Sequence, residues 1–96
     1  MEGQEFQDLT FIMTDEEFDV LDELYFVQSF DFLKEETNLS AENLISILKN
    51  LIQKGWVKCF SDRPALDPID EKSLGEDWLA YFYLATKEGL LAHNGR

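Results

Sequence analysis

The sequence predicts a small α+β domain, in which three helices are followed by a two-stranded antiparallel hairpin and a short C-terminal helix. The prediction starts from residues 39–57. Ser40 is a favourable N-cap, because its hydroxyl can accept from an otherwise unpaired amide of the first helical turn. Leucines then recur at three- and four-residue spacing and form one apolar face, and Gly55 suits a left-handed helix end. The β-prone residues 56–60 follow, so this helix is predicted to pass directly into a strand.

Residues 1–13 are predicted to form an N-terminal arm whose apolar second half packs on the domain or on a second subunit. Thr14 and Glu17 follow with the spacing of a capping box, in which each side chain bonds the backbone amide of the other residue. We expect the first helix to run from Thr14 to Val27. Its acidic residues are predicted to form a solvated face, which contains Asp15, Glu16, Asp19, Asp22 and Glu23.

The second helix is predicted over residues 32–37, with Ser29 or Asp31 as its cap. The third helix covers residues 41–54. A turn of three residues separates these two helices. Residues 31–54 are therefore predicted to form a helix-turn-helix.

The strands of the hairpin are predicted at residues 56–61 and 78–85. The connecting loop, residues 62–77, contains two prolines and a glycine, which exclude a regular helix or strand through it. Thr86 is predicted to cap the last helix, residues 87–93.

This order of elements, with the residues at its junctions, resembles the winged helix-turn-helix family, of the kind seen in MarR- and PadR-like bacterial regulators. The family pattern runs from a Leu-Ser pair through spaced apolar residues to a Gly and a short strand. Its places are held here without a gap by Leu39, Ser40, Leu44, Leu48, Leu51, Gly55 and Trp56-Val57. Residues 83–89 are similar to the family's Tyr-x-Leu-Thr-x-x-Gly, with Ala85 in place of the leucine. The resemblance covers Thr14 to His93. It implies a single winged-helix domain over residues 1–96, with residues 56–85 as the wing.

Acidic residues dominate the charge: the chain has 20 Asp and Glu against 8 Lys and Arg, a formal net charge of −12. DNA-binding domains are usually basic, since their affinity comes largely from neutralising phosphates. The acidic residues gather before Thr37, whereas residues 37–60 carry three lysines against Glu42 alone. The third helix therefore lies in the one mildly basic segment of an acidic chain.

Hydrophobic residues make up 45% of the 96 residues, which is enough for one compact core. No apolar run is long enough to span a bilayer and no basic-then-apolar leader is present, so we expect a cytoplasmic protein. The single Cys59 cannot form an intrachain disulfide, and its place on a predicted strand suits a buried thiol.

The resemblance implies that the outer face of the third helix contacts DNA and that the wing adds a basic residue. The helix positions it assigns are Glu42, Asn43, Ile45, Ser46 and Lys49, with Asn50 at the edge, and the candidate in the wing is Arg63. Polar side chains there can bond phosphates and base edges, and Ile45 can contact a thymine methyl group. Glu42 would repel phosphates, and this helix carries no arginine, the commonest partner of guanine. The basic residues that could neutralise phosphates are Lys49, Lys54, Lys58 and Arg63.

Two functions are consistent with these observations. One is a DNA-binding transcriptional regulator, and the other is a winged-helix module that binds a protein partner and does not bind DNA. Fold association favours the regulator, whereas the net charge, the acidic wing and the missing arginine favour the protein-binding module. The sequence shows no catalytic constellation, phosphate-binding loop or metal-ligand spacing, so we expect neither an enzyme nor a metal or cofactor. We also expect a homodimer built with the N-terminal arm and the first helix.

Overall fold

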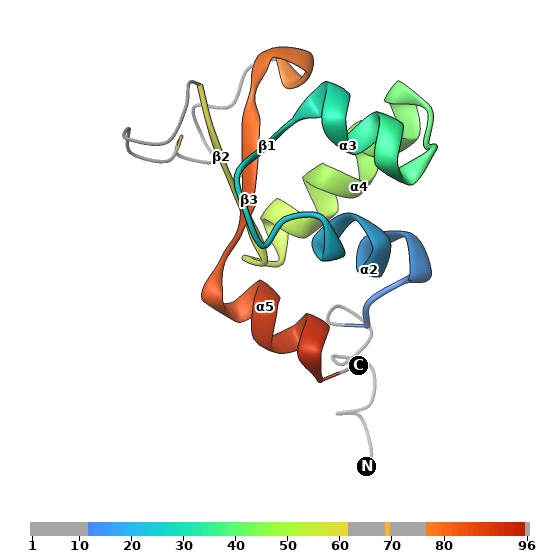
Figure 1. Ribbon diagram of the computed structural model, residues 1–96. Coiled ribbons are helices and arrows are strands. Elements are labelled where there is room, and N and C mark those ends of the chain that lie inside the picture. Colours follow the sequence, from blue (N-terminus) through green and yellow to red (C-terminus); the bar gives the residue numbers. More distant parts are fainter. Residues whose placement is uncertain (1–11, 62–68, 70–76, 96) are drawn as a thin grey trace.

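The computed structural model describes residues 12–61, 69 and 77–95, which form helices packed on a small antiparallel sheet (Figure 1). The α+β class predicted from the sequence is confirmed. In chain order the elements are α2 (Asp15–Asp22), β1 (Gln28–Ser29), α3 (Phe30–Thr37), α4 (Ala41–Gln53), β2 (Val57–Phe60), the 3₁₀ helix η3 (Trp78–Ala80), β3 (Phe82–Ala85) and α5 (Lys87–Asn94). In Figure 1, α2, α3 and α4 lie to one side of the sheet, and α5 lies beneath it next to α2.

The α-helices α2, α3, α4 and α5 each start at a hydroxyl cap. The side-chain oxygens of Thr14, Ser29, Ser40 and Thr86 accept from backbone amides three residues further on. The capping box predicted at the start of α2 is present, since Thr14 and Glu17 each bond the other's backbone amide at 3.0 Å. Gly55 adopts φ 79°, the left-handed conformation predicted for the end of α4.

In the described residues the sheet has three strands in the order β1-β3-β2, so the predicted two-stranded hairpin is only part of it. β3 pairs antiparallel with β2, as predicted, and the register places Cys59 opposite Tyr83. Its other edge pairs with β1, in the register Gln28↔Tyr83. β1 was not predicted because two residues are too short to show a strand pattern in the sequence.

The first helix is shorter than predicted and ends at Asp22 instead of Val27. Amides 23 and 24 bond carbonyls three residues back, which tightens the last turn. The carbonyl of Leu24 then accepts from the amide of Ala85 at 3.0 Å. Because this carbonyl is bonded to Ala85 in β3, it is not available to continue the helix to residue 27.

The second hairpin strand begins at Phe82, not at Trp78 as predicted. Trp78 and Tyr81 are both buried and their rings meet edge to face, with centroids 6.0 Å apart. A spacing of three residues places two side chains on one side of a 3₁₀ turn but on opposite faces of a strand. The hydroxyl of Tyr83 donates to the carbonyl of Trp78 and holds this turn against β3.

The core lies between the sheet and the helices. From the helices it takes Val20, Leu21, Leu24, Phe30, Leu33, Leu44, Ile47, Leu48 and Leu51, and from the sheet side Trp56, Val57, Cys59, Trp78, Tyr81, Tyr83 and Ala85. No helix in the described part of the chain is both long and apolar enough to cross a membrane.

Candidate functional site

Helix α4 presents a mostly polar outer face because most of its apolar residues turn inward. Leu44, Ile47, Leu48 and Leu51 are buried against the core. The exposed residues are Glu42, Asn43, Ser46, Lys49, Asn50 and Gln53. Four of the positions predicted to bind a partner, Asn43, Ser46, Lys49 and Asn50, therefore face outward.

The other two predicted positions differ from these four. Ile45 is half-buried and packs against the core, so only part of its side chain can reach a partner. Arg63 lies outside the described residues. Lys49 is exposed, but its ammonium lies 5.8 Å from the ring centroid of Trp78, within the range of a cation–π contact.

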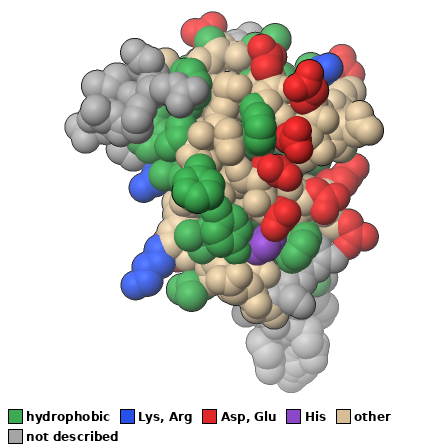
Figure 2. Space-filling view, in the orientation of Figure 1, with side chains coloured by type: hydrophobic (Ala, Val, Ile, Leu, Met, Phe, Trp, Pro, Cys, Tyr) green, Lys and Arg blue, Asp and Glu red, His purple; other side chains and the backbone are tan. Residues whose placement is uncertain are grey.

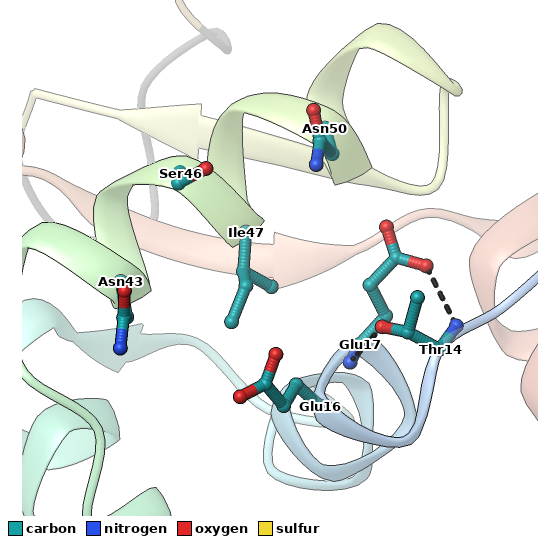
Figure 3. A pocket seen from close by; sticks show the side chains of 7 residues that line it. All are labelled: Thr14, Glu16, Glu17, Asn43, Ser46, Ile47 and Asn50. Carbon is teal, nitrogen blue, oxygen red and sulfur yellow. Dashed lines mark hydrogen bonds between the residues drawn. The ribbon is translucent and has the colours of Figure 1, made fainter.

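A groove runs between α4 and the start of α2. It has a volume of about 220 Å³ and is lined by Thr14, Glu16, Glu17, Asn43, Ser46, Ile47 and Asn50. Figure 3 shows the Ile47 side chain pointing from α4 toward Glu16, with Asn43, Ser46 and Asn50 spaced along the helix. The structure thus brings three predicted residues together at one groove and leaves Lys49 and Ile45 out of it.

The groove residues that were not predicted as binding positions are Thr14, Glu16, Glu17 and Ile47, and Glu16 is the exposed carboxylate among them. It belongs to the acidic run of α2, which was predicted to be a solvated face, and its side chain is indeed exposed. Its position across from Asn43 depends on how α2 packs on α4. No local pattern encodes that packing.

An ion pair with little exposure to solvent links α2 and α4 beside the groove. The Nζ atom of Lys54 lies 2.8 Å from Oε1 and 2.9 Å from Oε2 of Glu17, and it also donates to the carbonyl of Ile12. The Lys54 and Glu17 side chains are 13% and 3% exposed. The same ammonium lies 4.8 Å from the ring centroid of Trp56. Lys54 was predicted as one of the residues that could contact phosphates. In the structure its ammonium is instead paired with the carboxylate of Glu17.

Negative charge dominates the neighbouring surface. Figure 2 shows acidic side chains gathered over α2 and α3, with basic side chains mainly at the opposite edge. Burial, together with the negative charges of Glu36 and Asp22, raises the pKa of Glu23 above its ordinary 4.5. Glu23 is therefore repelled by the carboxylates of Glu36 and Asp22.

A second polar cluster joins the turn after α2 to α5. The Tyr25 hydroxyl donates to Oδ1 of Asn94 and lies 2.9 Å from Nδ1 of His93, whose ring stacks on Phe18 with centroids 4.1 Å apart. Oδ1 of Asp22 lies 3.4 Å from Nε2 of His93. Because the His93 side chain is only 9% exposed, this cluster is a packing contact between elements and not an open site.

No group of three or more His, Cys, Asp or Glu side chains among the described residues could hold a metal ion. Burial raises the pKa of the Cys59 thiol to about 11, so the thiol stays protonated and is a poor nucleophile. The N-terminal arm is described only from Ile12. The homodimer expected through it stays a prediction.

The chain matches no protein-family model, and no curated protein or solved structure is similar to it at a significant level.

Proposed function

We propose that the domain is a winged helix that binds a protein partner through the outer face of α4 and the groove beside it. The fold part of this proposal is supported by the element order from α2 to β3 and by the sheet order β1-β3-β2. In this arrangement α3 and α4 form the helix-turn-helix, and β2 and β3 form the wing. The proposed function is binding and not catalysis, and its support comes from the charges around α4.

The main observation in support of the proposal is the ion pair between Lys54 and the buried Glu17. DNA affinity depends on lysines and arginines that can approach phosphates. Of the four basic residues that the sequence offered, Lys54 is held at 2.8 Å by a buried carboxylate, and Lys58 is half-buried on β2. Lys49 is exposed on α4.

The acidic residues beside α4 strengthen the argument. Glu42 is exposed in its first turn, and Glu16 lines the groove next to Asn43. A phosphate approaching this face would meet the carboxylates of Glu42 and Glu16 and the ammonium of Lys49. With Lys54 excluded, three basic residues remain as phosphate contacts, so the slope of log affinity against log salt would not exceed roughly −3 per subunit. Such a surface suits a protein with basic residues better than a nucleic acid.

Site-specific photo-crosslinking in cells of the source organism tests the proposal. A photoreactive amino acid is placed at Ser46 on the outer face of α4 and, as a matched control, at Lys87, an exposed position on α5. We expect a discrete protein adduct from position 46 that the control lacks. A nuclease-sensitive adduct at position 46 would contradict the proposal, and so would equal labelling of both positions.

A further inference from the structure

We propose that the groove between α2 and α4 accepts an arginine side chain of the protein partner. This inference rests on the proposed function and specifies the chemistry of the contact. It is carried by the size of the groove, by the hydrogen-bonding groups on its two walls and by the charge of its α2 side.

The groove is of a size for one side chain. Its volume of about 220 Å³ falls below the range of about 300–1,000 Å³ that is usual for small-molecule pockets. Ile47 contributes an apolar surface to its lining and is itself 7% exposed. An aliphatic stem can pack on Ile47 while its polar head group stays between the walls.

Polar side chains line both walls. The α2 wall supplies the carboxylate of Glu16, and the α4 wall carries the side chains of Asn43, Ser46 and Asn50, each of which has an oxygen that can accept a hydrogen bond. None of these four side chains makes a hydrogen bond to another described residue. A guanidinium group has five N–H donors in a flat fork, so it can bond both walls at once. A lysine ammonium is a point charge and matches a two-walled set of acceptors less well.

The charge balance favours a cation over an anion. Two carboxylates line the groove, those of Glu16 and Glu17. The ammonium of Lys54 is paired with Glu17, so the carboxylate of Glu16 remains as a negative charge that a cation can meet. A metal ion is a poorer match, because Lys54 occupies the carboxylate of Glu17 and leaves Glu16 as the one remaining carboxylate in the lining.

The test uses the acetylated and amidated tripeptide Gly-Arg-Gly, with Gly-citrulline-Gly as a probe of nearly equal shape without the charge. The peptides are titrated into ¹⁵N-labelled protein, and the side-chain amide signals of Asn43 and Asn50 are followed by NMR. We expect saturable shifts with the arginine peptide and none with the citrulline peptide. Glu16→Gln should weaken the arginine peptide about fivefold, as expected for loss of an exposed charge-assisted contact. The control Glu35→Gln removes the same charge from an exposed position on α3 and should leave the affinity unchanged.

Three results would overturn the inference: equal shifts with citrulline, equal weakening by Glu35→Gln, or no shift at either asparagine at tens of millimolar peptide. If position 46 still traps a protein in the crosslinking experiment, the proposed function stands and only the arginine contact fails. If position 46 traps nucleic acid while the arginine peptide binds, the proposed function fails and the groove keeps its preference for a guanidinium group.

Discussion

The ammonium group of Lys54, at the end of α4, lies 2.8 Å from the buried carboxylate of Glu17, in the first turn of α2. Glu17 also accepts from the amide of Thr14, so one carboxylate caps its own helix and ties it to α4. This pair sets the position of α2 against α4 and thereby the width of the groove between them. It also removes a positive charge from the surface that a DNA-binding winged helix would use.

Removing one partner of the Lys54–Glu17 pair should destabilise the protein strongly, and removing both should destabilise it much less. Lys54→Met should lower the free energy of unfolding by about 3 kcal/mol, because it leaves Glu17 charged and buried without its partner. The double variant Glu17→Gln/Lys54→Met should recover much of that loss. Urea unfolding measures each value. Lys87→Met is the matched control on an exposed site and should change stability by no more than about 0.5 kcal/mol. If Lys54→Met proved as mild as the control, Lys54 would be free in solution and available for phosphates.

Replacing Glu23 by glutamine should stabilise the protein, and the gain should depend on pH. Its pKa is raised in the folded state by burial and by the charges of Glu36 and Asp22. The folded protein therefore binds this proton more tightly than the unfolded chain, and stability falls as pH rises from about 4.5 through the folded pKa. Glu23→Gln should then stabilise the protein at about pH 7, by less than about 1 kcal/mol because the side chain keeps contact with solvent.

The gain from Glu23→Gln should vanish at about pH 3, where the carboxyl is protonated in both states. Urea unfolding at the two pH values checks this, with Glu35→Gln as a control for the loss of one negative charge. Equal effects of the two variants at both pH values would show that the local repulsion at Glu23 is absent.

The packing of α5 at Gly89 leaves no room for a side chain. A Cβ atom there would overlap the carbonyl oxygen of Trp56, and the backbone on both sides is fixed by the Thr86 hydroxyl, which donates to the carbonyl of Gly55 and accepts from the Gly89 amide. Gly89→Ala should cost about 1–3 kcal/mol, although alanine is the better helix former. Gly95→Ala is a milder control, because its Cβ would lie 3.3 Å from the nearest atom. Thermal unfolding compares the two, and a rise in midpoint for Gly89→Ala would refute this packing.

The parts of the fold that the sequence predicts are those encoded within a few neighbouring residues. The caps at Ser40 and Thr86 and the left-handed Gly55 each depend on contacts within one helical turn, and the structure has them where predicted. The short first helix and strand β1 depend on a hydrogen bond between Leu24 and Ala85, which are far apart in the sequence. Patterns of hydrophobicity do not record such a bond.

The candidate site divides in the same way. The outward direction of Asn43, Ser46 and Asn50 follows from helical spacing, and the structure agrees. The groove needs Glu16 from another helix, and the sequestration of Lys54 needs Glu17 from that helix as well. The sequence gives the residues of α4 that face outward, but tertiary packing decides which of the nearby charges remain available.

The most direct test of the central claim, that the α4 face serves a protein partner and not DNA, is a titration of mixed-sequence duplexes at about 50 mM salt, followed by fluorescence anisotropy. Low salt favours any phosphate contact, so it gives DNA binding its best chance. The account predicts no saturable binding by the folded protein. Saturable binding that weakens with added salt and is abolished by Lys49→Glu would contradict it.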